Sequence, residues 1–428
     1  MDGVLALGAA LRVQPVHIIG AGLAGLSAAV ELTQVGIPVT LSDQAARAGG
    51  RCRSYHDPQL DMIIDNGNHL VFSGNRAVNA YLATIGASER LTGPDHAAFA
   101  FHDLRDGTRW TMRASDGRIP WWVFQKSRRT PGTRVVDHLP LARLMTAGVT
   151  ATVGEVVPTS GTFWDRLAEP VLLAVLNTDA ATGSAKLAGQ VVRESLAKGG
   201  LASRPMIATP TLDAAFVDPA LAWLGARGVM PQFGRRLRSI GFDGDRVTTL
   251  DFGGGAESVM GAAVILAVPA WVAAELVPGL TVPDQHSTIL NAHFAFPAPT
   301  GSAPMTGLIG SLSQWVFAFA DRISVTVSAA DAVIDDERED LARRIWAEVC
   351  QTLAITAPLP AWQIVKEKRA TFAATPAQDA KRPFAATRWR NLFLAGDWTQ
   401  TGLPATIEGA LRSGATAAKL VQKVRKLD

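Results

Sequence analysis

The chain has 428 residues, of which 48% are hydrophobic and 18% are charged, and its formal net charge is +3. Disordered proteins are less hydrophobic and more charged, and nucleic-acid-binding proteins carry a larger basic excess, so both classes are excluded. Cys52 and Cys350 are the only cysteines and no HExxH pair occurs, so we expect neither a disulfide framework nor a metal site.

The first predicted elements form a βαβ unit. The strand-like run VHII starts at Val16, Gly20-Ala-Gly22-Leu-Ala-Gly25 follows it, and a helical pattern then extends to Gly36. The run IPVTLSD, which ends at Asp43, is a second buried strand. This order predicts a parallel sheet of the Rossmann type.

Each residue of this glycine motif has a role in binding a dinucleotide. Gly20 permits a tight turn, Gly22 lets the backbone approach a diphosphate, and Gly25 permits close packing of helix on strand. The helix N-terminus offers free N–H groups to the phosphates. Asp43 is placed to bind ribose hydroxyls, and its charge disfavours the 2′-phosphate of NADP.

Two later stretches complete the same predicted domain. After a helix from about 221, we expect strands over 229–233 and 235–240, a Gly244-Asp245 hairpin turn, and further strands up to 268. A strand near 392–396 and a helix from about 406 end the chain. The expected fold class is therefore α/β, with a discontinuous Rossmann-like dinucleotide-binding domain, which the motifs below identify as FAD-binding, and an inserted mixed α+β substrate-binding domain. The boundaries are 1–72, 221–282 and 391–428 for the first and 73–220 and 283–390 for the second.

Two further motifs favour FAD over NAD. Gly49-Gly50-Arg51 offers a cation and flexible backbone to a diphosphate. Gly396-Asp397 ends a strand and precedes a helix N-terminus, whose dipole suits a flavin edge that gains negative charge on reduction.

With these motifs, the chain resembles the flavin amine oxidase and phytoene desaturase superfamily. The resemblance implies that FAD is the cofactor. It places Asp397 near the ribityl-phosphate portion, Thr406 and Ile407 near the flavin ring, and the Leu237 backbone near adenine. The complete predicted cofactor-binding set is Gly20, Gly22, Leu23, Ala24, Gly25, Asp43, Gln44, Gly49, Gly50, Arg51, Gly67, Asn68, His69, Leu237, Gly396, Asp397, Thr406 and Ile407.

Other runs narrow the resemblance, which extends from about Val16 over nearly the whole chain. DNGNHL at 65–70, EPVLLAVLNT at 169–178 and Ser184-Ala185 are similar to the squalene-associated FAD-dependent desaturases, now assigned as hydroxysqualene dehydroxylases. This implies reductive dehydroxylation of a polyprenoid, hydroxysqualene, to squalene in hopanoid precursor synthesis. The alternatives are a carotenoid-type desaturase, an amine oxidase, and a non-catalytic lipid-binding flavoprotein.

The candidate catalytic residues are His69, Asn68 and Asn177. In the superfamily the 65–70 segment passes beside the flavin ring, and His69 is the natural acid because the unperturbed pKa of histidine is near 6.5. The alternative is that His69 hydrogen-bonds backbone and shapes the site. Asn177 lies in an apolar helical run and either orients the substrate hydroxyl or satisfies a bend, while Asp65 is expected to fix the loop or an arginine.

The segment from Ile119 to Arg129 joins aromatic residues to cations. Trp121 and Trp122 are expected either to contact a membrane surface or to be core residues beside a solvated basic loop. The apolar stretch 262–280 is interrupted by Pro269 and Pro278 and predicts a buried strand followed by a short helix. We therefore expect a cytoplasmic protein, at most peripheral on the inner face of the membrane.

The remaining expectations concern the electron donor, two charged runs and the N-terminus. No second GxGxxG motif occurs, which leaves a separate reductase or ferredoxin as the electron donor. The acidic run 335–340 predicts a helix N-terminus, and the run 366–369 predicts a solvated face. Residues 1–11 lack the basic start of a signal peptide and are interpreted as a short extension.

Overall fold

A parallel sheet joins segments from all three stretches of the expected cofactor domain. The computed structural model describes residues 14–426, so the expected extension over 1–11 lies outside the described residues. The sheet has the order β19-β13-β1-β2. Its strands are β1 (Val16–Ile19), β2 (Val39–Ser42), β13 (Val264–Leu266) and β19 (Leu392–Leu394).

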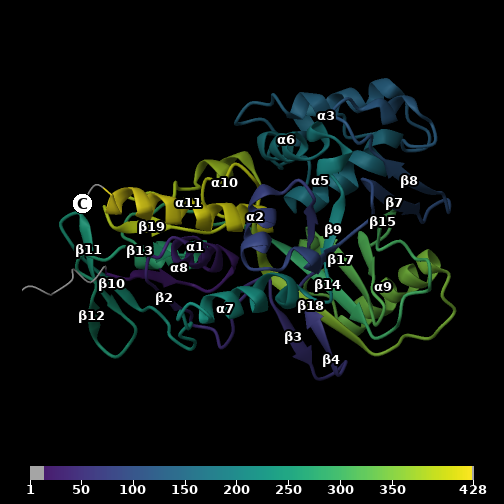
Figure 1. Ribbon diagram of the computed structural model, residues 1–428. Coiled ribbons are helices and arrows are strands. Elements are labelled where there is room, and N and C mark those ends of the chain that lie inside the picture. The colour runs from purple at the N-terminus through teal and green to yellow at the C-terminus, as the bar shows by residue number, and fades with distance from the viewer. Residues whose placement is uncertain (1–13, 427–428) are drawn as a thin grey trace, which may run out of the picture.

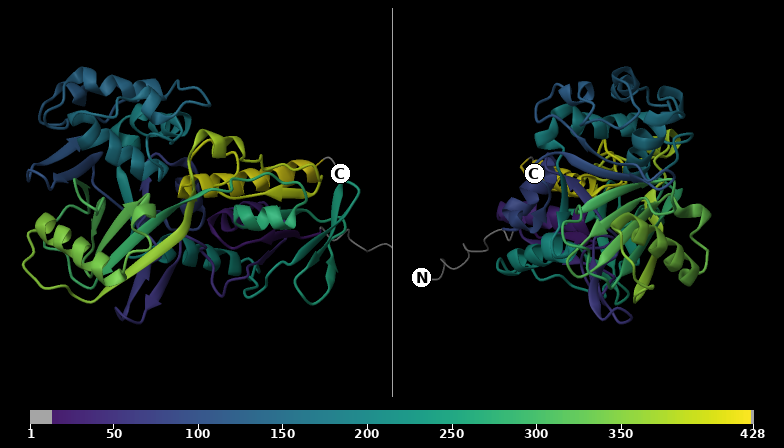
Figure 2. Two further views of the ribbon diagram at one scale, coloured as in Figure 1. Left: turned by 180° about the vertical axis from the view of Figure 1, so that it is seen from behind. Right: turned by 90° about the vertical axis from the view of Figure 1, so that its right-hand side faces the viewer.

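The first and last long helices pack side by side on this sheet, as both views show (Figures 1 and 2). These helices are α1 (Leu23–Gln34) and α11 (Ile407–Arg425). Ser27 Oγ donates to the carbonyl of Leu411 at 2.8 Å. A Cβ at Gly414 would lie 2.1 Å from the carbonyl oxygen of Ala24, so glycine is required for this close approach. The predicted meeting of the first glycine turn and the last helix is confirmed.

A larger mixed sheet forms a second unit and has the order β18-β14-β17-β16-β15-β7-β8. Its strands are β7 (Ala98–Asp103), β8 (Arg109–Arg113), β14 (His286–Phe294), β15 (Met305–Ile309), β16 (Trp315–Ala318), β17 (Ile323–Ser328) and β18 (Trp362–Phe372). Side chains alternate across a strand, and Leu290, Ala292, Val325 and Val327 form an apolar face against helix α9 (Arg338–Leu353). On the opposite side, a helical layer packs against the sheet (Figure 1).

The helical layer contains α3 (Leu139–Leu144), α4 (Val153–Val156), α5 (Glu169–Leu176) and α6 (Ala185–Glu194). The other helices are α2 (Arg76–Thr84), α7 (Asp218–Gly225), α8 (Ala270–Leu276) and α10 (Pro376–Ala380). The small sheets contain β3 (Ser54–Asp57), β4 (Met62–Asp65), β5 (Leu70–Phe72), β6 (Leu91–Thr92), β9 (Pro205–Ala208), β10 (Ser239–Asp243), β11 (Arg246–Asp251) and β12 (Ala256–Ser258). Strand β5 pairs with β9, across the expected boundary between 1–72 and 73–220, and the division into two domains remains our proposal.

Most of the predicted elements are present. The hairpin β10–β11 turns at Gly244-Asp245, and α9 begins in the acidic run. The predicted strand over 229–233 is wrong, because only Gln232 forms a bridge, to Ser42, and Pro231 has no N–H to extend a ladder. The predicted strand over 235–240 is likewise too early, since β10 begins at Ser239. Within residues 14–426 no helix combines the length and the apolar character that crossing a bilayer requires.

Candidate functional site

Two glycine-rich turns face each other at the end of β1. Packing within the protein leaves no room for a side chain at two of these glycines. A Cβ at Gly20 would lie 2.3 Å from the carbonyl oxygen of Ala267, and a Cβ at Gly25 would lie 1.8 Å from the carbonyl oxygen of Gly20. Gly22 is different, because a Cβ there would meet only the Cα of Gly50, at 3.9 Å. The space beside Gly22 is therefore a cradle lined by backbone, and its residues fit the diphosphate of FAD.

Asp43 is held at the edge of this cradle. Its carboxylate accepts from Ala21 N at 2.6 Å and from Ala45 N at 2.7 Å. A carboxylate has about four acceptor positions, so positions remain for ribose hydroxyls. The carbonyl of Asp43 accepts from Arg235 N at 2.8 Å. This bond places the segment from Arg235 to the buried Leu237 beside Asp43.

The Gly396-Asp397 turn is held in place by hydrogen bonds from two other parts of the chain. Gly396 has φ +151°, and its N–H donates to Ser413 Oγ of α11 at 2.9 Å. Arg382, which is fully buried, donates to the carbonyls of Asp397 at 3.0 Å and of Thr399 at 2.9 Å and pairs with Asp379. Sequence reasoning missed Arg382, because an arginine between Lys381 and Pro383 gives no sign of burial.

Arg51, Asp397 and His69 lie together, although the sequence separates them widely. Arg51 donates to Asp397 Oδ1 at 2.6 Å and to the Ala370 carbonyl at 2.7 Å. Burial lowers the pKa of His69 to about 4, with the Arg51 charge adding to this effect and Asp397 opposing it. His69 is therefore neutral at pH 7, so it can offer an N–H to a substrate but is not a charged acid.

The first turn of α11 begins at Thr406, as predicted for the flavin end of the site. Thr406 Oγ1 accepts from Gly409 N at 3.0 Å and caps the helix. The cap leaves the N–H groups at Ile407 and Glu408 at the positive end of the helix dipole. Contact of Thr406 and Ile407 with a flavin ring remains a prediction.

The other predicted cofactor residues fall on the same two turns and the loop beside them. Leu23 and Ala24 form the buried first turn of α1, and Gln44 is exposed beside Asp43. Gly49 bridges to Gly22 in parallel register, with Gly50 next to it.

The DNGNH loop is bound to the large sheet by its own polar side chains. Asp65 accepts from Ser54 Oγ at 2.6 Å and from Leu212 N at 2.9 Å and lies 3.5 Å from the buried Arg322, which confirms that it fixes the loop and an arginine. Asn66 Nδ2 lies 3.5 Å from Glu367 of β18.

The run 366–369 is a strand segment with two different faces, not a uniformly solvated one. Lys366 and Lys368 reach out to the 335–336 loop. Glu367 points the opposite way, is half-buried and contacts Asn66. The predicted solvated face is therefore wrong for Glu367, because strand alternation turns this residue inward.

Asn177 ends helix α5 in the left-handed conformation, with φ +50°. Its Nδ2 donates to Thr371 Oγ1 at 3.0 Å, and its Oδ1 accepts from Ala329 N at 2.6 Å. Both ends of the amide thus have protein partners, which favours satisfaction of a bend. A catalytic contact of Asn177 remains a prediction that no observation supports.

The aromatic segment near residue 120 splits into exposed and buried parts. Trp121 is 60% exposed and Phe124 is 61% exposed, their rings lie 6.1 Å apart, and Ile119 is also exposed. Trp122 is 6% exposed and packs edge-on against His138. The prediction of a membrane contact through Trp122 is therefore wrong. We call Ile119, Trp121 and Phe124 the Trp121 patch.

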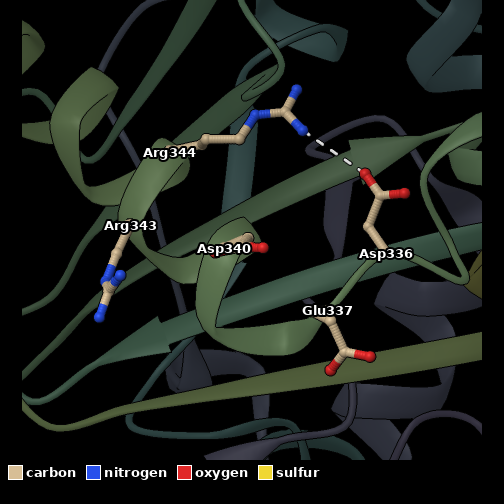
Figure 3. A pocket seen from close by; sticks show the side chains of 5 residues that line it. All are labelled: Asp336, Glu337, Asp340, Arg343 and Arg344. Carbon is tan, nitrogen blue, oxygen red and sulfur yellow. Dashed lines mark hydrogen bonds and ion pairs between the residues drawn. The ribbon is translucent and has the colours of Figure 1, made fainter.

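A shallow cavity of about 450 Å³ lies at the start of α9, away from the glycine turns (Figure 3). Charged side chains line it, and Arg344 pairs with Asp336 across it at 3.5 Å. Among residues 14–426 no group of His, Cys, Asp and Glu side chains could hold a metal ion. This cavity does not contribute to the site.

Comparisons with known proteins agree with this geometry. A family model described as flavin containing amine oxidoreductase matches residues 23–422. The chain is 51% identical over 408 residues to the hydroxysqualene dehydroxylase of Rhodopseudomonas palustris, covering 95% of this chain and 98% of that relative. It is 49% identical over 406 residues to the hydroxysqualene dehydroxylase of Sinorhizobium fredii, covering 95% and 97%. The fold matches that of cyclohexylamine oxidase from Brevibacterium oxydans with a TM-score of 0.69 at 14% identity, over 97% and 100% of the two chains.

Proposed function

Because this chain belongs to the flavin-containing amine oxidoreductase family, and within it to the hydroxysqualene dehydroxylases, we propose that it reduces hydroxysqualene to squalene and water with FAD as cofactor. The observation that carries this proposal is identity of about one half along almost the whole of both chains. The protein is an FAD-dependent oxidoreductase, and its substrate is a polyprenoid.

The chain's own residues bind the two ends of the cofactor. The backbone at Gly22 and Gly50 would hold the diphosphate, with Arg51 supplying positive charge. Asp43 would accept from the adenosine ribose. The N-terminus of α11 places a positive dipole end where a reduced flavin ring carries negative charge.

Dehydroxylation needs a hydride at the allylic carbon and a proton at the leaving oxygen. Reduced FAD, when bound, would supply both, because the fully reduced flavin carries two electrons and two protons. His69, neutral at pH 7, would donate its N–H to the leaving hydroxyl, which stabilises the negative charge that develops on the oxygen. In this proposal the hydrogen bonds of Asn68 to the large sheet give it a positioning role, whereas those of Asn177 satisfy the bend at the end of α5.

A separate reductase supplies the electrons in this proposal. The chain carries one GxGxxG motif, which the adenosine side of FAD accounts for. No further motif of this kind remains in the sequence that would indicate a second nucleotide site, for NADH or NADPH.

The test is anaerobic incubation of the chemically reduced protein with hydroxysqualene. We expect one squalene per flavin, detected by mass, together with return of the oxidised flavin absorbance. Flavin that stays reduced would indicate a non-catalytic lipid-binding flavoprotein. Products with additional double bonds, formed by the oxidised protein, would indicate a desaturase.

We also propose that the Trp121 patch rests on the inner, cytoplasmic face of the membrane, where an insoluble substrate is available. The patch is apolar and exposed, and Arg118 and Lys126, also exposed, flank it. Aromatic side chains beside cations suit the interface of an anionic bilayer.

Vesicles containing anionic phospholipid should bind the wild type and bind a Trp121→Ser/Phe124→Ser variant at least about a hundredfold more weakly, since burying each of the two rings is worth about 1.5 kcal/mol or more. Vesicle flotation measures the bound fraction. The control is Phe384→Ser, because Phe384 is 75% exposed but lies outside the patch. Equal flotation of both variants and the wild type would contradict the contact.

A further inference from the structure

The large sheet carries buried polar side chains that an apolar substrate does not explain. On the face turned away from α9, the register pairs Asn291 of β14 with Thr326 of β17, and His293 with Ser324. All four side chains are buried. Burial of such groups costs free energy unless they are hydrogen-bonded, so this face needs a polar partner.

The partner is the loop that precedes His69. Asn291 Oδ1 accepts from Asn68 N at 3.3 Å and from Thr326 Oγ1 at 2.8 Å, and lies 3.5 Å from Asn68 Nδ2. Asn68 Nδ2 also donates to Thr326 Oγ1 at 3.1 Å. We call Asn68, Asn291 and Thr326 the amide clamp.

Gly67 shows how closely the loop lies on the clamp. A Cβ at Gly67 would lie 3.1 Å from Asn291 Nδ2, which is tighter than ordinary side-chain packing. The loop backbone thus lies close against the Asn291 amide, and a side chain at position 67 would push on this amide.

The clamp ends one residue before His69. Burial and the charges of Arg51 and Asp397 act on the side chain of His69, but no hydrogen bond from another described residue holds this side chain in place. Its position is therefore set through the chain on either side, by the clamp at Asn68 and by strand β5, which starts at Leu70 and pairs with β9.

We propose that Asn291, supported by Thr326, is a positioning residue that fixes His69 beside Arg51 and the reacting carbon through the backbone of Asn68. This inference rests on the proposed function, because its kinetic test measures the dehydroxylation proposed above. No motif of the sequence marks Asn291, since it lies in the middle of a strand more than 200 residues from the loop it holds.

The test compares two threonine-to-valine changes in the same sheet. Thr326→Val removes the hydroxyl that bonds Asn68 and Asn291. Thr288→Val, the matched control, removes a buried hydroxyl that has no partner among the described residues. Thr326→Ser restores the hydroxyl, and Asn291→Leu removes the clamp's central acceptor at similar volume.

We expect Thr326→Val and Asn291→Leu to lower kcat for hydroxysqualene about tenfold or more with KM little changed, since misplacing a catalytic group by about 1 Å can cost up to about a hundredfold. Thr288→Val and Thr326→Ser should behave like the wild type. Adding either clamp change to His69→Ala should cause no further loss, because residues that act through one group are not additive. Additive losses would overturn the proposal.

A second readout does not depend on the substrate. The pKa of His69, followed by NMR of histidine-labelled protein with His69→Ala for assignment, should be about 4 in the wild type and in Thr288→Val. It should rise in Thr326→Val, as the half-buried His69 moves away from Arg51 and becomes more accessible to water. A pKa that is unchanged in Thr326→Val would overturn the positioning role. A shifted pKa in a protein that forms no squalene would leave the clamp supported and would refute only the proposed function.

Discussion

Gly22→Ala should yield a folded protein that fails to retain FAD. Gly22 has φ −73° and ψ 178°, a conformation that alanine adopts without strain, and the added Cβ would meet no protein atom closer than 3.9 Å. The protein therefore tolerates the methyl group, whereas a diphosphate lying against this backbone does not. We expect FAD affinity to fall at least about a hundredfold, a loss of about 2.7 kcal/mol or more.

Visible flavin absorbance of the purified variant and titration with added FAD measure this effect. The unfolding temperature without FAD should equal that of the wild type, and only the wild type should gain stability on adding FAD. Gly254→Ala is the control, because Gly254 is exposed in a loop with nothing near its Cβ position. A Gly22→Ala protein that retains stoichiometric FAD would refute the cradle.

The same experiment separates two kinds of glycine. Gly25→Ala should fail to fold at all, because its Cβ would lie 1.8 Å from the Gly20 carbonyl oxygen in the presence or absence of FAD. The contrast between the two substitutions distinguishes a glycine required by the cofactor from one required by helix packing.

His69→Ala should abolish dehydroxylation while FAD stays bound. Removing a group that stabilises a leaving oxygen costs about 10²- to 10⁴-fold in rate. The cradle at Gly22 and the charge of Arg51 are untouched, so flavin content should not change. Single-turnover squalene formation by the reduced protein measures the rate, and the absorbance spectrum measures the flavin.

The pH dependence provides a sharper criterion for His69. Burial and the Arg51 charge lower its pKa to about 4, so the neutral form predominates above that value and the wild-type rate should show no ionisation of His69 near pH 6.5. An ionisation near pH 6.5 in the wild-type rate that is absent from the residual rate of His69→Ala would contradict this assignment. His96→Ala, which alters a half-buried histidine that lies 3.5 Å from Asp116, should leave rate and flavin unchanged.

The turns that form the candidate cofactor site were largely predictable from the sequence because each turn is local. A strand, a glycine turn and a helix start within ten residues of one another, and the backbone demands of each glycine depend on its immediate neighbours. The same holds for Gly396-Asp397 and the Thr406 cap. The structure then shows that the turns meet across β1, β13 and β19.

The catalytic side was only partly predictable because it depends on contacts between distant segments. The sequence marked His69 but not the low pKa, which comes from burial and from Arg51 on another turn. The sequence does not distinguish the two neighbouring tryptophans, yet Trp122 is buried against His138 and Trp121 is exposed. Glu367, in a charged run, turns inward to the DNGNH loop.

By itself, therefore, the sequence determined the class of protein, the cofactor and the presence of a parallel sheet built from separate stretches of the chain, since these follow from short motifs and backbone conformation. Only the tertiary structure decided which polar side chains are buried and what they hold. Arg382 and Asn291 are ordinary surface-type residues in the sequence, and packing of segments more than ten residues away places each inside. Burial is a property of those long-range contacts, and no local pattern at either residue encodes it.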